Sequence, residues 1–322
     1  MTREAPNKPE TSRKRCGFVA LIGAPNAGKS TLLNRFAGAK IAIVTPKAQT
    51  TRAQLRAIRI HAPSQLIFID TPGIFTPRRG LDTLMVQTAR GGARQADIVL
   101  FMVDARTGLD ADTQAVIEML ETMRPALWLV LNKVDAVKPA GLLPLSRRIN
   151  EQLVCGNTFM ISALTGDGVD DLLTQLAKAM PEGDWLYPAD RIADVPLRFM
   201  AAEIVREKLF LRLRHELPYA TTVETTRWTR RADGSVRIEQ VIYVERAGQK
   251  KILLGKNGRM IRTIGQAARE ELRSMLGVEV HLFLFVKLCE NWQRDRERLE
   301  MMGLDLQPAG VSAKADGLMR RQ

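Results

Sequence analysis

The sequence predicts two folded domains, an α/β domain with a mostly parallel sheet followed by a smaller α+β domain. Three observations predict this. Short apolar runs alternate with helical stretches up to about residue 180. A phosphate-binding loop follows the first apolar run. Residues 197–287 then read in the order α-β-β-α-α-β. A length of 322 residues suits about two domains, and 45% hydrophobic residues suffice for ordinary cores.

The phosphate-binding loop has the pattern G-x-x-x-x-G-K-[ST] and lies between a predicted strand at 17–22 and a predicted helix at 31–36. Glycines let backbone N–H groups surround phosphate oxygens, and the helix N-terminus adds partial positive charge. Lys29 can reach the β- and γ-phosphates, and Ser30 can ligate Mg²⁺. The residues expected at the phosphates are Gly23, Ala24, Pro25, Asn26, Ala27, Gly28, Lys29, Ser30 and Thr31.

A second motif follows the apolar residues 66–69 and reads Asp70, Thr71, Pro72, Gly73 and then Ile74. A carboxylate at the end of a buried strand can hold the Mg²⁺ shell through water, and the Gly73 N–H can face a γ-phosphate. Only four residues separate the predicted strands 54–60 and 65–69. Because a parallel pair needs a longer crossover, these two strands are expected to form an antiparallel hairpin.

Two further motifs indicate guanine. Asn132, Lys133, Val134 and Asp135 follow the apolar run 127–131. The Asp135 carboxylate can accept the N1–H and the 2-amino hydrogens of guanine, donors that adenine lacks on that edge. The Lys133 stem can lie over the base. Another apolar run at 158–161 leads to a segment in which a backbone N–H can reach the guanine O6; its residues are Ser162, Ala163 and Leu164.

In this order the motifs resemble those of the translation-factor-like GTPases. The pair Thr50-Thr51, together with Asn26 and the apolar Ile74, is similar to the Era branch. The resemblance implies a first switch segment that supplies Thr51 to Mg²⁺. In the general GTPase template a Gln near the position of Ile74 orients the attacking water. The predicted switch residues are Gln49, Thr50, Thr51, Arg52 and Ala53.

Since Ile74 cannot orient water, the resemblance implies a potassium ion held by Asn26 and backbone carbonyls of the switch. Asn26 could instead cap its own turn. The residues expected to matter for catalysis are therefore Asn26, Lys29 and Thr51, with Mg²⁺ on Ser30, on Thr51 and, through water, on Asp70. The predicted activity is Mg²⁺-dependent, potassium-stimulated GTP hydrolysis, and no side chain is an obvious general base.

The predicted second domain contains a helix at 197–216 and strands at 222–229 and 236–245, joined by a turn at Asp233-Gly234. A helix, a Gly-Lys-Asn-Gly turn, an amphipathic helix and a strand at 278–287 follow. No acidic residue lies between Arg246 and Arg262. This order resembles the type II KH domain, in which a basic G-x-x-G loop clamps single-stranded RNA. The expected RNA-binding residues are Lys250, Lys251, Gly255, Lys256, Asn257, Gly258, Arg259 and Arg262.

A solvated basic helix start is the plainer interpretation of the same residues. The apolar spacing of Ile261, Ile264, Ala268 and Leu272 favours the KH interpretation. The fold class is therefore an α/β P-loop GTPase domain followed by an α+β type II KH domain, which is the layout of the Era family.

The predicted boundaries follow from composition. They are a disordered tail at 1–14, the G domain at 15–182, a linker at 183–196, the KH domain at 197–303 and a mobile tail at 304–322. A last helix is expected at 291–302, with Asn291 as its cap. The N-terminus is polar, unlike a signal peptide, and no apolar run is long enough to span a bilayer.

The net charge of +13 favours a polyanionic partner or an acidic membrane surface, and it is spread over both halves of the chain. Cys16, Cys155 and Cys289 lack paired spacing and are expected to be free thiols of a reducing cytoplasm. The resemblance implies GTP and GDP, the 3′ end of 16S rRNA and the 30S subunit as partners. It also implies a role in 30S maturation, with peripheral contact to the inner face of the cell membrane. We expect a monomer.

Two other functions fit part of the sequence. A nucleotide-gated RNA-binding scaffold would make hydrolysis incidental, although the intact switch motifs argue against it. A GTPase of RNA modification would need an extra catalytic domain, and no insertion in this chain is large enough.

Overall fold

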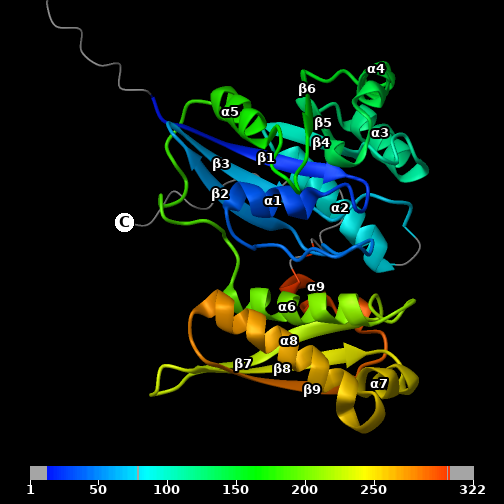
Figure 1. Cartoon of the computed structure of the whole chain (residues 1–322), viewed down its shortest axis with the longest axis vertical. Coiled ribbons are helices and arrows are strands. Elements are labelled where there is room, and N and C mark those ends of the chain that lie inside the picture. Colours follow the sequence, from blue (N-terminus) through cyan, green and yellow to red (C-terminus); the bar gives the residue numbers. More distant parts are fainter. Residues whose placement is uncertain (1–12, 78–79, 303, 305–322) are drawn as a thin grey trace, which may run out of the picture.

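The computed structural model describes residues 13–77, 80–302 and 304. Two sheets with their covering helices form two halves, the first half of the chain above and the second below in Figure 1. The GTPase-like α/β fold and the KH-like α+β fold predicted above are both present.

The first sheet has six strands in the order β2-β3-β1-β4-β5-β6. β2 pairs antiparallel with β3, as the short link between them predicted, and the other neighbours pair parallel. The strands are β1 (Arg15–Gly23), β2 (Leu55–His61), β3 (Ser64–Asp70), β4 (Ile98–Asp104), β5 (Leu127–Asn132) and β6 (Asn157–Ile161).

Helices cover both faces of this sheet (Figure 1). One face packs on α1 (Lys29–Ala37) and α5 (Val169–Ala179), where Phe36 stacks on Phe68 with ring centroids 4.2 Å apart. The other face packs on α2 (Gly80–Gln95), α3 (Ala111–Met123) and α4 (Leu142–Asn150). Strands buried on both faces read as continuous apolar runs, which is why they were visible in the sequence.

The second sheet has the order β7-β8-β9, with β7 (Thr221–Arg230) antiparallel and β9 (Val280–Leu288) parallel to β8 (Val236–Val244). One face packs on three helices through a core that includes Ile264, Ala268 and Leu272, as their helical spacing predicted. The helices are α6 (Leu197–Arg212), α7 (Ala247–Leu254) and α8 (Arg259–Leu276). α6 ends at Arg212 rather than at Glu216, because Leu213 has an extended backbone.

The C-terminal segment differs from the predicted single helix. A short 3-10 turn, η4 (Trp292–Arg294), comes first, and α9 (Arg296–Met301) follows. Asn291 has a left-handed backbone and its side chain makes no cap bond, whereas Asp295 accepts the cap bond from the Arg298 N–H. The chain turns here because the fully buried Trp292 ring donates to the Ala220 carbonyl at 3.1 Å.

Leu304, which the sequence assigned to a mobile tail, is buried with Trp292, Leu299 and α2 residues of the first half. The predicted tails at 1–12 and 305–322 lie outside the described residues. Among the residues that the structure describes, no helix is long and apolar enough to cross a membrane.

Parallel strands bring the ends of β1, β4, β5 and β6 to one edge of the first sheet, and the parallel pairing of β3 with β1 brings the end of β3 there too. Open α/β sheets bind ligands at this edge. The four nucleotide motifs of the sequence all follow these strands, so they meet there.

Candidate functional site

The loop between β1 and α1 is closed by its glycines and by Lys29. Gly28 has φ +97, and a Cβ there would lie 2.1 Å from Nδ2 of Asn132, so only glycine fits. Lys29 Nζ donates to the carbonyls of Gly23 at 2.9 Å and Ala24 at 2.8 Å. Burial lowers the pKa of Lys29 to about 8, and the Asp70 carboxylate opposes this shift. The lysine is thus held inside the loop that would surround the phosphates.

The three residues predicted to serve Mg²⁺ are in contact. Ser30 Oγ lies 2.7 Å from Asp70 Oδ2 and 2.8 Å from Thr51 Oγ1, and Thr51 donates to Asp70 Oδ2 at 3.3 Å. Oδ1 of Asp70 is buried and has no hydrogen-bond partner among the described residues. Burial raises the pKa of Asp70 to about 6, against the opposing effects of Lys29 and Ser30. Two hydroxyls and an unsatisfied carboxylate oxygen match what a hard dication prefers.

Gly73 approaches the phosphate-binding loop directly. A Cβ on Gly73 would lie 3.0 Å from the backbone of Pro25, and the Ile74 N–H donates to the Gly23 carbonyl at 3.1 Å. The Thr71 hydroxyl donates a hydrogen bond to the Leu21 carbonyl at 2.8 Å. The Ile74 side chain is buried in the core under α2 and cannot reach a water at the phosphates.

A cavity of about 470 Å³ opens above the loop. Of the residues predicted for the first switch, Gln49, Thr50 and Thr51 line this cavity, whereas Arg52 and Ala53 do not. Arg52 turns away and is buried against the second domain. Five further residues that no sequence motif indicated also line the cavity, namely Ile43, Val44, Thr45, Pro46 and Arg106.

Asn132 connects the phosphate side of the site to the base side. Its Nδ2 donates to the Ala27 carbonyl at 2.8 Å, and its Oδ1 accepts the Ala163 N–H at 2.9 Å. The carboxylate-bearing Asp135 is exposed on the short turn η1 (Val134–Ala136), and Leu164 is exposed beyond Ser162. The predicted guanine residues therefore lie at one end of the phosphate-binding loop.

Three side chains that support this arrangement were missed in the sequence. Asp104, at the end of β4, accepts from Lys133 Nζ at 2.7 Å and from Arg106 at 2.7 Å. Burial opposes its charge, but these hydrogen bonds outweigh burial and hold the pKa of Asp104 below its ordinary value. Arg35 of α1 donates to the Ala163 carbonyl at 2.7 Å. Asp104 could have been found, because it follows a buried strand as Asp70 does; nothing local signals Arg35.

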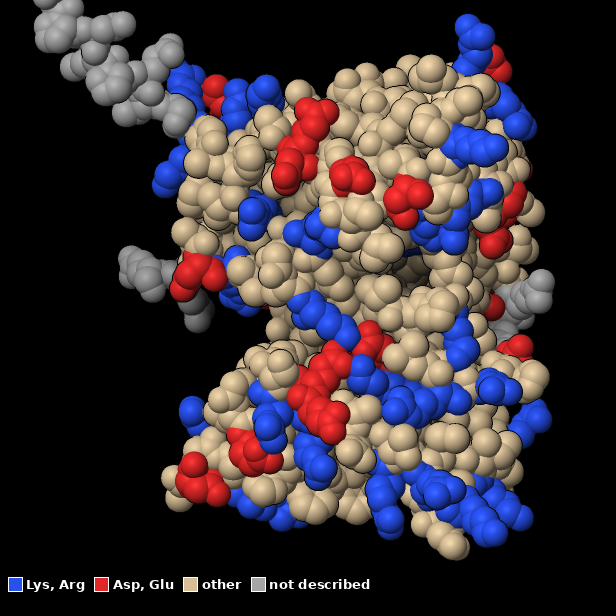
Figure 2. Space-filling view, viewed as in Figure 1, with Lys and Arg blue, Asp and Glu red and all other residues tan. Residues whose placement is uncertain are grey.

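The second predicted site is the Gly255–Gly258 turn (η3, Lys256–Gly258) between α7 and α8. Gly255, Asn257 and Gly258 have φ of +71, +54 and +72, and a Cβ on Gly255 would meet Met260 at 2.9 Å. Lys256 and Asn257 are exposed at the tip. Figure 2 shows Lys and Arg side chains gathered over this end of the second domain; those of the turn and its flanks are Lys250, Lys251, Lys256, Arg259 and Arg262.

This combination defines a class of protein, a P-loop GTPase joined to a KH domain. Comparisons with known proteins agree. A family model described as 50S ribosome-binding GTPase matches residues 18–133, and a KH domain model matches residues 216–293.

The chain belongs to the Era family of GTPases. It is 56% identical over 304 residues to GTPase Era of Brucella suis, covering 94% of this chain and 98% of that one. It is 57% identical over 296 residues to GTPase Era of Mesorhizobium japonicum, covering 92% and 96%.

Solved structures give the same result. An Aquifex aeolicus Era variant bound to GDP·AlF₄⁻ matches with a TM-score of 0.85 and 37% identity, over 90% of this chain and 99% of that one. Era in complex with MgGDPNP and nucleotides 1506–1542 of 16S ribosomal RNA matches with the same values, a TM-score of 0.85 and 37% identity over 90% and 99%.

Proposed function

We propose that this protein is a Mg²⁺-dependent GTPase switch whose KH domain binds the 3′ end of 16S rRNA during assembly and maturation of the 30S subunit. The main observation behind the proposal is the exposed basic Gly255–Gly258 turn, on a chain that matches an Era structure containing 16S rRNA nucleotides over 90% of its length. Family membership supports GTP hydrolysis, and the MgGDPNP and RNA bound to that relative support Mg²⁺ and rRNA as ligands.

Different residues of the chain would hold Mg²⁺ and neutralise the phosphates. Ser30 and Thr51 would ligate Mg²⁺, and the buried Asp70 carboxylate would hold a water of its shell. Bound there, the ion neutralises phosphate charge, as in other GTPases. Lys29 holds a further positive charge inside the loop. Phosphoryl transfer to water depends on positioning and on neutralised charge, and these residues supply both.

Potassium is the proposed substitute for a water-orienting glutamine. Asn26 is exposed, has φ +63 and lines the nucleotide cavity together with Gln49 and Thr50 of the switch. An amide oxygen and nearby switch carbonyls are suitable oxygen donors for a monovalent cation. The buried Ile74 leaves the orientation of water to such an ion.

The switch would respond to the γ-phosphate. Thr51 and Gly73 both line the nucleotide cavity and can both contact a third phosphate. Loss of that phosphate removes the contacts and can release both segments. Because the first switch lies against the KH domain, its release can change how that domain is presented to RNA.

We place the G domain at 15–182, a linker at 183–196 and the KH domain at 197–303, in a monomer. A net charge of +13 supports peripheral contact of a cytoplasmic protein with the inner face of the anionic cell membrane.

The test is a double substitution in the turn, Lys256→Asp with Asn257→Asp. Both side chains are exposed and no glycine changes, so the domain should fold. Affinity for a single-stranded 16S rRNA 3′ end should fall about tenfold or more, with a weaker salt dependence, because phosphate contacts are lost.

A matched control is Arg148→Asp with Asn150→Asp on α4, which makes the same change in net charge on an exposed face of the G domain. The RNA affinity of the control should fall by less than about threefold, which is the loss expected from the change in net charge alone. Equal losses in the two double variants would show that the turn is only a solvated basic surface.

A further inference from the structure

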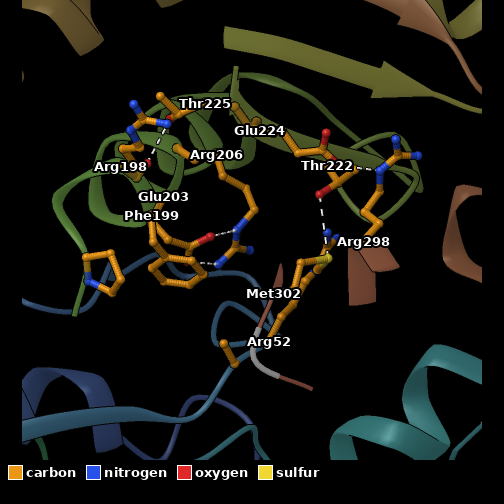
Figure 3. A pocket seen from close by; sticks show the side chains of 14 residues that line it. Arg52, Arg198, Phe199, Glu203, Arg206, Thr222, Glu224, Thr225, Arg298 and Met302 are labelled. Atoms are coloured by element: carbon orange, nitrogen blue, oxygen red, sulfur yellow. Dashed lines mark hydrogen bonds and ion pairs between the residues drawn. The ribbon is translucent and has the colours of Figure 1, made fainter. Parts of the chain in front are cut away.

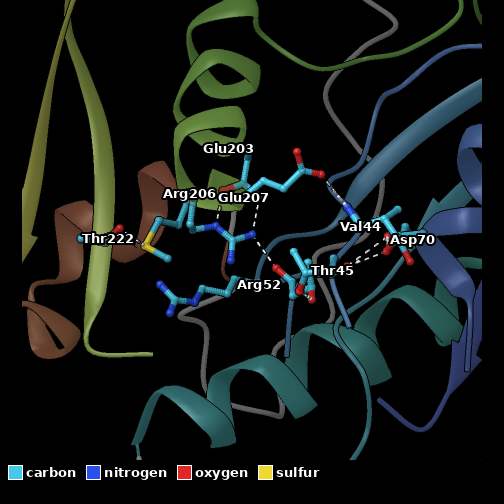
Figure 4. A network of polar contacts seen from close by, with 12 residues as sticks. Val44, Thr45, Arg52, Asp70, Glu203, Arg206, Glu207 and Thr222 are labelled. Atoms are coloured by element: carbon cyan, nitrogen blue, oxygen red, sulfur yellow. Dashed lines mark hydrogen bonds and ion pairs between the residues drawn. The ribbon is translucent and has the colours of Figure 1, made fainter. Parts of the chain in front are cut away.

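The segment 44–53, which ends with the predicted first-switch residues, lies along helix α6 of the KH domain (Figure 4). At its start, the Val44 N–H donates to Glu207 Oε1 at 3.1 Å. Further along, Lys47 Nζ donates to the carbonyls of Phe210 and Leu213 at the end of α6, the latter at 2.8 Å. This segment is therefore held against the second domain, beside the nucleotide cavity.

Arg206 of α6 makes the contact nearest to the reaction site. Its Nη2 donates to the Thr50 carbonyl, next to Thr51. Its Nε donates to Glu203 Oε1 at 2.6 Å, and Nη2 also donates to that carboxylate, so Glu203 fixes the plane of the guanidinium. The Arg206 side chain is 2% exposed and lies over the Phe210 ring, 5.1 Å from its centroid.

Arg52 anchors the other side of Thr51. Its guanidinium donates to the carbonyls of Thr221 at 2.7 Å and Tyr219 at 3.1 Å, both in the KH domain. It lies near the rings of Phe210 and Trp292, at 5.7 and 5.5 Å from their centroids. Both neighbours of Thr51 in the chain are thus held by groups outside the G domain.

Buried charged contacts of this kind stabilise a domain interface less than apolar packing would. Burying two guanidinium groups near each other is unfavourable; burial, with Arg206 adding to it, lowers the pKa of Arg52 to about 9. Nη1 of Arg206 is buried with no partner among the described residues. Figure 3 shows Arg206, Arg298 and Glu203 around a neighbouring cavity of about 240 Å³. Apolar side chains would pack better there, but they would not direct a hydrogen bond to one chosen carbonyl.

We propose that Arg206 is a positioning residue for GTP hydrolysis. Its hydrogen bond to the Thr50 carbonyl, fixed by Glu203, keeps Thr51 Oγ1 on the metal site formed with Ser30 and Asp70. The KH domain thereby completes the catalytic arrangement of the G domain in the same chain. This inference rests on the proposed role of Thr51 as a Mg²⁺ ligand.

The experiment compares Arg206→Ala and Arg206→Lys with the parent, all as full-length chains. Single-turnover GTP hydrolysis is measured against Mg²⁺ concentration, and GDP affinity is measured separately. We expect Arg206→Ala to be about tenfold slower and to need more Mg²⁺ for half-maximal rate, as for loss of one charge-assisted hydrogen bond. GDP affinity should stay within about twofold, because GDP has no γ-phosphate to engage the switch. Arg206→Lys keeps the charge and should recover part of the rate.

Arg198→Ala is the matched control. Arg198 is an exposed arginine of the same helix that lines the same cavity, and within the described part of the chain its side chain has no hydrogen bond or ion pair to the switch. Its hydrolysis rate and Mg²⁺ midpoint should equal those of the parent. A similar loss in Arg198→Ala and Arg206→Ala would mean that the helix contributes only bulk charge, and would overturn the proposal.

A double variant separates this inference from the role of Thr51. If Arg206 acts through Thr51, adding Arg206→Ala to Thr51→Ala should slow hydrolysis no further. If the rate of the double variant falls by the product of the two single-variant losses, the positioning role is overturned, while Thr51 remains a ligand. If the Thr51→Ala single variant needs the same Mg²⁺ concentration as the parent for half-maximal rate, the assignment of Thr51 as a Mg²⁺ ligand is refuted.

Thermal unfolding checks that each variant is folded. Should Arg206→Ala fail to fold, Glu203→Gln provides the second route, because Glu203 is only partly buried and fixes the guanidinium that donates to the Thr50 carbonyl. Its rate should fall about threefold with GDP affinity unchanged, and a parental rate would overturn the proposal.

Discussion

Asn132 is the side chain whose removal should most directly damage the nucleotide site. It is 1% exposed, and its amide joins the Ala27 carbonyl of the phosphate-binding loop to the Ala163 N–H of the base-side loop. Alanine at this position would leave both backbone groups without their partner. Ala27 and Ala163 are themselves buried, at 1% and 2% exposed, so water does not readily replace the amide.

The expected cost follows from those two groups. Each buried donor or acceptor that loses its partner costs about 1–3 kcal/mol. Relaxation of the loops reduces the sum, so we expect a loss of about 2–4 kcal/mol in the free energy of unfolding of the G domain. Both GTP and GDP should bind more weakly, because the two loops that Asn132 joins are those proposed to bind groups common to the two nucleotides.

The assay is equilibrium urea unfolding of the full chain, followed by circular dichroism, together with GTP and GDP titrations. A chain with two domains need not unfold in one step, so the first-domain transition is the quantity compared. Asn150→Ala is the control, since the exposed Asn150 amide donates to the Ser146 carbonyl of the same helix at 2.9 Å and to the exposed Thr158 hydroxyl at 3.5 Å. It should change stability by less than about 0.5 kcal/mol. A loss below about 1 kcal/mol in Asn132→Ala, with normal nucleotide affinity, would refute the reasoning.

Three further outcomes are expected. Asp135→Asn should weaken GTP binding by about a thousandfold or more and favour xanthosine triphosphate, because a carboxylate acceptor of guanine is lost; unchanged GTP affinity would disprove the base assignment. GTP hydrolysis should be faster in potassium than in sodium, and Asn26→Ala should shrink that difference; equal rates in both salts would exclude a potassium role. Burial raises the pKa of Cys155 to about 11, so its alkylation by iodoacetamide, read by peptide mass spectrometry, should be slow at pH 8 and speed up towards pH 11. Rapid labelling of Cys155 at pH 8 would contradict this.

The sequence by itself determined the nucleotide motifs and the fold class, because each motif is contiguous and its context is local. Gly28 and Lys29 lie between a buried strand and a helix that are both visible as apolar patterns. Asp70 was found because it ends such a strand. In the second domain the spacing of Ile264, Ala268 and Leu272 already marked a buried helix face.

Sequence reasoning failed where partners are far apart in the chain. Asp295 caps the helix in place of the predicted Asn291, because the buried Trp292, whose ring N–H donates to the Ala220 carbonyl, turns the chain before α9 begins. Arg35 of α1 has no local signal in the sequence, and its hydrogen bond to the Ala163 carbonyl exists only in the folded chain.

The tertiary structure alone decided the surroundings of the first switch. Arg52 reads as one more residue of a switch motif, yet its acceptors are carbonyls of Tyr219 and Thr221. Arg206 reads as an ordinary helical arginine, yet it contacts Thr50 from the other domain. Local propensity and periodicity report on neighbours within a few residues. Contacts between residues as far apart in the chain as Arg206 and Thr50, 156 positions, depend on how two complete domains pack, which no local pattern encodes.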